Sequence, residues 1–186
     1  MKIVGGELRG RTFGQPKTAT VRPLTDKVRA SIFDVVGAPN GGVVLDAYAG
    51  SGAAGFEALS RGAAIVEAIE GNPRVARVIE ENVRALQIDW GYVLNVLKVE
   101  TWLALPGNQP EISRPIERYD LIIADPPYAQ LDADILERLG RFLLTDGVMV
   151  VSHSSKTPSP MLESMSLAKA KVYGDTALSF YRGVEK

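Results

Sequence analysis

From Val43 onward, short apolar runs alternate with longer stretches in which apolar residues recur at helical spacing. Five runs predict strands: VVLDAY, AIVEAIE, YVLNVL, YDLIIAD and GVMVVSHS. The segments between them predict helices over Ala53–Arg61, Pro73–Leu86, a short piece around Trp102, and Asp132–Leu144. This alternation is typical of an α/β fold, a mostly parallel sheet with helices on both faces.

Both ends of the chain depart from this alternation. The stretch AKAKVYGDTALSFYRG predicts two strands around Gly174-Asp175, an antiparallel hairpin that completes a seven-stranded sheet. The first 24 residues are rich in Gly, Pro and Arg, with short β-like pieces, and Thr25 can cap a helix over Asp26–Val36. We expect an N-terminal β/helix extension, residues 1–40, on an α/β domain, residues 41–186, with a surface loop over 106–118.

Composition excludes several kinds of site. A chain of 186 residues is long enough for one well-packed domain. It has no cysteine and one histidine, His153, so neither a thiolate or histidine metal cluster nor a Ser-His-Asp triad is expected, and no metal is predicted. There is no signal peptide and no apolar run that could span a membrane. We therefore expect a cytoplasmic protein, or an organellar one if a targeting segment has been removed.

Charge is distributed unevenly along the chain. The net charge is −1, but residues 1–36 carry seven Lys and Arg against three Asp and Glu. A basic arm on an acidic body is suited to contacting phosphates. A merely solvated arm remains the alternative on charge alone.

The stretch LDAYAGSGAAG follows the first strand directly and opens a helix. Gly50, Gly52 and Gly55 match G-x-G-x-x-G in the context that favours a nucleoside cofactor, and Glu70 after the second strand can bind ribose hydroxyls. The motif fits NAD and S-adenosylmethionine (SAM) equally, and a purely structural turn is the alternative. Asp46, four residues before Gly50, suits the ammonium group of an amino acid better than a pyrophosphate, although it could instead cap the loop.

The fourth predicted strand ends in Asp125-Pro126-Pro127-Tyr128. Proline stiffens this exit, and neither proline has an N–H to compete for the Asp125 carboxylate and the Pro126 carbonyl. Two fixed acceptors suit a planar –NH₂ group, whose nitrogen becomes nucleophilic when its lone pair is turned toward an electrophilic methyl. Tyr128 offers a face for stacking a base. A proline-rich strand exit without chemistry is the alternative, weakened by the glycine loop nearby.

These residues resemble a known family. VLDAYAGSGAAGFEALSRGA, Glu70 and DPPY resemble class I SAM-dependent amino methyltransferases, which have a Rossmann-like fold. IVGGELRGR, RPLTDKVRASIFD and VYGDTAL resemble the RsmD-like bacterial and organellar enzymes that methylate a guanine amine of 16S-type ribosomal RNA (rRNA). The resemblance runs from Ile3 to about Tyr181.

The resemblance implies roles for individual residues. It places SAM against Thr25, Asp46, Tyr48, Ala49, Gly50, Ser51, Gly52, Glu70, Lys98 and Val99. It places the target amine at Asp125, Pro126, Pro127 and Tyr128, and RNA against Arg9, Arg11, Arg22, Lys27 and Arg29. Two positions depart from the family pattern: Lys98 stands where Asp or Asn usually contacts adenine, and Asn72 replaces an acidic residue after Glu70.

The expected function is methyl transfer from SAM to the exocyclic N2 amine of a guanine in 16S-type rRNA. The expected partner is rRNA within an assembled or assembling small ribosomal subunit, because a small arm makes few base contacts; we expect no membrane partner, and a monomer. The alternatives are an adenine-N6 methyltransferase and a non-catalytic RNA-binding relative. Glutamine methylation and an NAD-dependent dehydrogenase fit less well, since DPPY has Asp rather than Asn and His153 is the one general-acid candidate.

Overall fold

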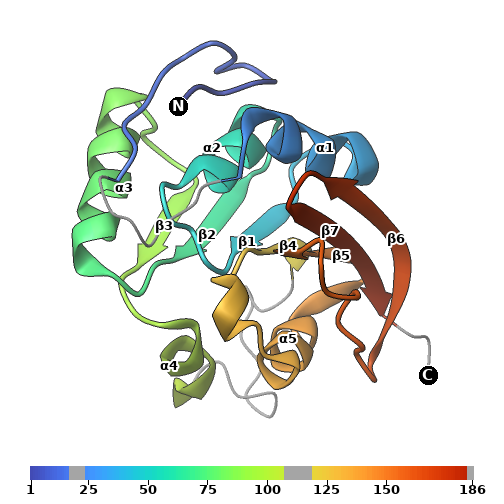
Figure 1. Cartoon of the computed structure of the whole chain (residues 1–186). Coiled ribbons are helices and arrows are strands. Elements are labelled where there is room, and N and C mark those ends of the chain that lie inside the picture. Colours follow the sequence, from blue (N-terminus) through green and yellow to red (C-terminus); the bar gives the residue numbers. More distant parts are fainter. Residues whose placement is uncertain (17–23, 107–118, 184–186) are drawn as a thin grey trace.

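A computed structural model describes residues 1–16, 24–106 and 119–183, and the described chain forms a seven-stranded sheet flanked by helices (Figure 1). The strands are β1 (Val43–Asp46), β2 (Ile65–Ile69), β3 (Tyr92–Asn95), β4 (Tyr119–Ala124), β5 (Leu143–Ser154), β6 (Met165–Tyr173) and β7 (Thr176–Gly183). The helices are α1 (Asp26–Val36), α2 (Ala53–Ser60), α3 (Pro73–Ala85), α4 (Val99–Ala104), α5 (Ala133–Gly140) and the 3₁₀ turn η2 (Tyr128–Gln130).

The sheet has the order β3-β2-β1-β4-β5-β7-β6. The five strands from β3 to β5 run parallel, and β7 pairs antiparallel with both β5 and β6. The predicted α/β class, the parallel core and the C-terminal hairpin are thereby confirmed. The order reverses direction between β1 and β4, which is where ligands bind in sheets of this kind.

Helices cover both faces of the sheet, and successive residues of a central strand point into different cores. Val44 packs with α1 and α2, whereas Leu45, the next residue, packs with α4 and α5. In Figure 1, α1, α2 and α3 lie on one side of the sheet and α4 and α5 on the other. This double burial explains why the central strands are nearly continuous apolar runs.

The predicted helix over Asp132–Leu144 was too long. The structure ends α5 at Gly140 and begins β5 at Leu143, which pairs with Tyr119 ahead of a register shift in β4. The apolar run from Phe142 to Leu144 fits either period, and pairing with β4 decides in favour of a strand, since Tyr119 N donates to Phe142 O at 2.8 Å. The predicted helix over Asp26–Val36 is confirmed, with the Thr25 hydroxyl accepting from Val28 N.

The N-terminal segment, residues 1–16, lies on α2 and α3. Ile3 and Phe13 are buried in the same cluster as Phe56 and Ile79. The predicted β-like pieces meet in a single antiparallel bridge, Lys2 with Thr12. None of the helices in the described part of the chain is long and apolar enough to cross a membrane.

Candidate functional site

Three carboxylates meet where the order of the sheet reverses. Asp46 is the last residue of β1, and Glu70 and Asp125 directly follow β2 and β4. Because these strands are parallel neighbours, the three side chains lie at one edge. Negative charge on Asp125 and Glu70 adds to the rise in the pKa of Asp46 that burial causes, as expected for groups this close together.

The glycine loop between β1 and α2 has a backbone that requires glycine. Gly50 and Gly52 have φ angles of 56° and 80°, in the left-handed region that other residues rarely adopt. Gly55 is needed for packing, since a Cβ there would lie 2.9 Å from Val66 of β2. The loop is closed by a turn in which Gly52 N donates to Ala49 O at 2.8 Å. This arrangement brings a bare backbone and the start of α2 to the sheet edge.

Asp46 is a buried acid at the bottom of this loop, only 1% exposed. Its Oδ2 accepts from Gly55 N at 3.0 Å, and within residues 1–16, 24–106 and 119–183 it has no ion-pair partner. Burial raises its pKa to about 7. A buried carboxylate without a cation fits a ligand that brings its own ammonium group.

Glu70 fastens the glycine loop to the end of β2. Its Oε2 accepts from Gly50 N at 2.9 Å and its Oε1 from Asn72 N at 2.7 Å. Partial burial raises the pKa of Glu70, and the two N–H groups oppose that rise. Each carboxylate oxygen has a second lone pair, so Glu70 can still accept from two ribose hydroxyls.

The remaining predicted cofactor residues surround this loop. Tyr48 is half-buried against the core and burial raises its pKa, while Ser51 is 2% exposed. Lys98 is exposed and its backbone lies beside Gly71, whereas Val99 is buried at the start of α4. Thr25 is exposed and caps α1.

The DPPY motif leaves β4 at the same edge. Asp125 is half-buried, Pro126 is buried, and Pro127 and Tyr128 are exposed. Burial raises the pKa of Asp125 to about 6. Ser152, adjacent on β5, favours the charged form, although its hydroxyl has no hydrogen-bond partner of normal geometry among the described residues. Asp125 is therefore a mostly ionised acceptor at neutral pH.

Tyr128 is held from the C-terminal hairpin. Its hydroxyl hydrogen-bonds the Thr176 hydroxyl at 2.9 Å, and the ring remains 39% exposed. The turn before Thr176 is tied to the exit of β5, since Ser155 N donates to Asp175 O at 3.0 Å. One wall of the site is thus built from three segments far apart in the sequence.

Three of the five predicted RNA-contacting side chains are exposed. Arg9, Arg11 and Lys27 are exposed, with Lys27 lying over the Tyr173 ring and Arg11 donating to the carbonyl of Leu86. Arg22 lies outside the described residues.

Arg29 requires a correction. It is 1% exposed and donates to the carbonyls of Lys2 and Leu24 and to the Asp26 carboxylate, with Glu57 at 3.8 Å. Burial leaves it no surface for RNA, so its role is to tie α1 to the N-terminal segment. Its i, i+3 spacing from Asp26 was the available signal in the sequence.

Sequence reasoning missed three residues of this region. Thr176 supports Tyr128, Ser152 lies beside Asp125, and Asn82 of α3 contacts the glycine loop. Asn82 alone left a signal, a polar residue on the otherwise apolar inner side of a helix.

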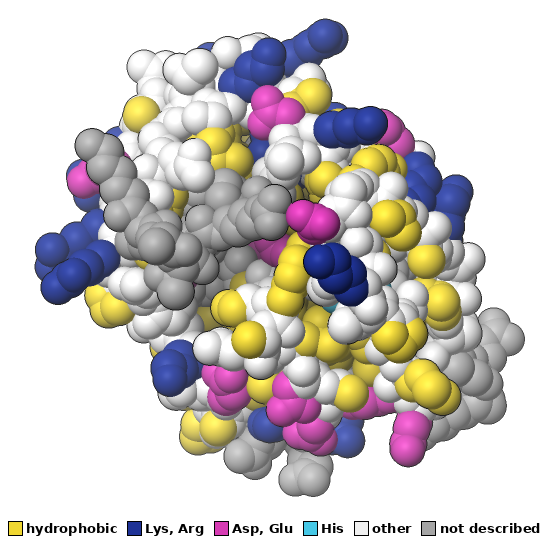
Figure 2. All heavy atoms as spheres, viewed as in Figure 1, with side chains coloured by type: hydrophobic (Ala, Val, Ile, Leu, Met, Phe, Trp, Pro, Cys, Tyr) yellow, Lys and Arg dark blue, Asp and Glu magenta, His cyan; other side chains and the backbone are white. Residues whose placement is uncertain are grey.

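Charge is divided across the face seen in Figure 1. In the same view, Lys and Arg gather mostly over the N-terminal segment, α1 and α3, and acidic side chains mostly along the lower edge over α4 and α5 (Figure 2).

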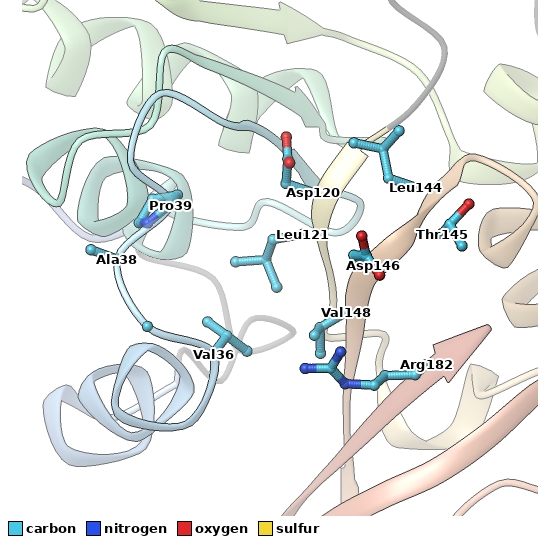
Figure 3. A pocket seen from close by; sticks show the side chains of 12 residues that line it. Val36, Ala38, Pro39, Asp120, Leu121, Leu144, Thr145, Asp146, Val148 and Arg182 are labelled. Atoms are coloured by element: carbon cyan, nitrogen blue, oxygen red, sulfur yellow. The ribbon is translucent and has the colours of Figure 1, made fainter.

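A separate hollow of about 520 Å³ lies at the opposite edge of the sheet (Figure 3). Asp120, Asp146 and Arg182 line it beside the apolar side chains of Val36 and Leu121. None of the predicted site residues lines it, and we assign it no part in the chemistry.

Known proteins are similar to this chain in sequence and in fold. The family described as Conserved hypothetical protein 95 matches residues 1–182. The "Ribosomal RNA small subunit methyltransferase D" of Escherichia coli strain K12 is 30% identical over 192 residues, covering 98% of this chain and 89% of that protein. A solved Escherichia coli methyltransferase superposes with a TM-score of 0.82 at 26% identity, covering 98% and 97% of the two chains. A methyltransferase complexed with S-adenosylhomocysteine (SAH) shares the fold alone, with a TM-score of 0.66 at 14% identity over 84% of this chain and 48% of its own.

Proposed function

The chain belongs to the family described as Conserved hypothetical protein 95, and we propose that it transfers a methyl group from SAM to the exocyclic N2 amine of a guanine in small-subunit rRNA. Methylation of rRNA is supported by the relatives named as small-subunit rRNA methyltransferases. Dependence on SAM is supported by the structural neighbour complexed with SAH. DPPY supports methylation of an amine, and guanine as the target rests on the resemblance carried by the N-terminal sequence elements.

The site residues fit SAM. Asp46 is a buried acid with no cation partner among the described residues, suited to the ammonium of the methionine part, and the glycine loop lets a ligand lie close to the backbone. Glu70 can accept from the ribose hydroxyls, with Lys98 and Val99 beside the adenine. When bound, SAM supplies an electrophilic methyl group.

Asp125 and the Pro126 carbonyl would accept hydrogen bonds from the two hydrogens of the target amine. Gripping both hydrogens aims the nitrogen lone pair at the methyl group and stabilises the positive charge that develops on nitrogen. The ring of Tyr128 would stack on the extruded base. The observation that carries the proposal is that Asp125 lies at the same sheet edge as Asp46 and Glu70, close enough to raise the pKa of Asp46.

Labelled methyl transfer from SAM to small-subunit rRNA tests this assignment. We expect Asp125→Ala to lower the rate by about 100-fold or more, in the range lost when one preorganised charge-stabilising group is removed. The matched control is Asp146→Ala, since Asp146 lies in the hollow at the opposite edge. Equal loss in both variants, or no loss in Asp125→Ala, would sink the assignment.

We further propose that the substrate is rRNA in an assembling small subunit, methylated in the cytoplasm by a monomer. The N-terminal segment expected to contact RNA is short, and a short segment makes few contacts to bases. Comparing naked rRNA with assembled subunits tests the first point, because equal or faster methylation of naked RNA contradicts it.

A further inference from the structure

Besides Arg29 of α1, which donates to the Lys2 carbonyl, three side chains of α2 and α3 fasten the N-terminal segment to the body. Glu57 of α2 accepts from Val4 N at 2.9 Å and from Gly5 N at 2.8 Å. Ser60 of α2 accepts from Leu8 N at 2.9 Å and donates to Gly5 O. Among the described residues, neither the Glu57 nor the Ser60 side chain forms a hydrogen bond with the glycine loop.

The third anchor, Asn82 of α3, does touch it. Its Oδ1 accepts from Gly14 N at 2.7 Å, while its Nδ2 donates to Gly14 O at 3.0 Å and to Ser51 O at 3.2 Å. Both amide hydrogens are used, one toward the N-terminal segment and one toward the loop. Asn82 is 3% exposed, so water cannot easily replace these bonds.

This geometry links two segments that have different proposed ligands. Ser51 belongs to the loop assigned to SAM, and Gly14 belongs to the segment that carries the RNA-facing Arg9 and Arg11. If either segment shifts, the Asn82 amide must turn and weaken its bonds to the other. A ligand that stiffens one segment therefore also favours the bonded arrangement of the other.

We propose that Asn82 is a positioning residue that couples the N-terminal segment to the glycine loop, so that RNA and SAM each strengthen binding of the other. The RNA half of this statement rests on the proposed function. Linkage requires the effect to be reciprocal and of equal size in both directions.

Calorimetry with SAH, with and without a transcribed small-subunit rRNA fragment, measures the coupling. In the wild type we expect RNA to tighten SAH binding about fivefold or more. In Asn82→Ala we expect SAH to bind more weakly and the effect of RNA to be reduced, since Ser51 Oγ still donates to Met1 Sδ at 3.4 Å. The control is Ser60→Ala, which loosens the same segment without touching the loop and should keep wild-type SAH affinity in the absence of RNA. Wild-type affinity and coupling in Asn82→Ala would overturn the proposal.

Amide hydrogen exchange in the unmodified protein gives a second test that does not depend on a variant folding. SAH should slow exchange of the Gly14 N–H, while the Val4 N–H, anchored to Glu57, serves as the internal reference. Unchanged Gly14 exchange at saturating SAH would contradict the coupling. A protein that shows this protection but methylates no rRNA would refute the proposed function and leave the coupling of segment and loop in place.

Discussion

Asp46 and Asp125 are the same residue type in two environments. Asp46 is wholly buried, and its pKa is near 7; without a ligand cation the charged form is unfavourable. Asp125 lies at the rim with a pKa of about 6, so at neutral pH it is mostly an ionised acceptor. The first is suited to binding a cation and the second to gripping an amine.

The buried carboxylate of Asp46 is expected to lower the stability of the ligand-free protein and to strengthen ligand binding. Its folded-state pKa of about 7 lies above the ordinary value of 3.8, so its contribution to stability is lost as pH rises from about 4 to 7. Asp46→Asn should therefore raise the Tm of the ligand-free protein at pH 8 more than at pH 5, and weaken SAH binding at least tenfold.

Thermal unfolding at the two pH values and calorimetry with SAH check this prediction. If the variant and the wild type had the same Tm at both pH values, burial of this charge would cost little folding stability. Undiminished SAH binding would contradict the assigned role of Asp46.

At the scale of elements, the site is made by the exits of strands and by what supports them. The β6–β7 turn holds Tyr128, and α2 holds the N-terminal segment through Glu57. Elements distant in sequence therefore decide where side chains of the motifs point.

Thr176→Val removes the hydroxyl that bonds Tyr128 while keeping nearly the same shape. We expect a loss of several-fold in kcat/KM for rRNA with unchanged SAH affinity, because an exposed hydrogen bond contributes about 1 kcal/mol. Thr176→Ser should restore the rate.

A double-mutant cycle with Tyr128→Phe makes the test specific. Each single change should cost about as much as both together. Fully additive losses would show that the two hydroxyls act independently.

The contacts of Glu57 predict that this residue stabilises the fold. It is fully buried, bonds two backbone N–H groups and pairs with Arg61 at 2.8 Å. Glu57→Gln removes the negative charge beside the buried Arg29, at 3.8 Å, and the partly buried Arg61, and should lower the free energy of unfolding by about 3 kcal/mol. The exposed pair of Glu80 with Arg84 is the control, and Glu80→Gln should cost less than about 1 kcal/mol in the same urea titration. Similar losses in both would contradict the role of Glu57.

Most strands and helices followed from apolar periodicity and caps, as Thr25 and Pro73 show at the starts of α1 and α3. The boundary of α5 did not, because Phe142 to Leu144 fit two periods and pairing with Tyr119 decided between them. Motif residues of the site were recognisable because glycine permits, and proline fixes, particular local backbone conformations. Thr176 left no signal, because its partner lies 48 residues away, and the polar Asn82 on an apolar helix side did not reveal its partner in the loop, 31 residues away.

At the scale of the whole molecule, the basic residues of the N-terminal part differ in how much of their charge reaches the surface. Exposed Arg9, Arg11 and Lys27 lie in the N-terminal part, whereas Arg29, charged but buried, contributes to packing. The number of exposed basic residues, rather than the total number in the sequence, should govern RNA affinity.

Salt dependence measures this contribution. Arg9→Ala and Lys27→Ala should each lower rRNA affinity and reduce the slope of log affinity against log salt by roughly 0.7, the value for one lost phosphate contact on single-stranded RNA. Arg138→Ala on α5 is the control and should leave the slope unchanged. Equal slopes in all four proteins would place the RNA elsewhere.

The identity of the methylated nucleoside tests the central claim most directly. Small ribosomal subunits that lack the modification are incubated with the protein and isotope-labelled SAM, and their rRNA is then digested to nucleosides and analysed by mass spectrometry. The account predicts label in N2-methylguanosine, formed more slowly by about 100-fold or more with Asp125→Ala. Label in N6-methyladenosine would support the adenine alternative, and SAH binding without any labelled nucleoside would contradict the claim that this chain methylates rRNA.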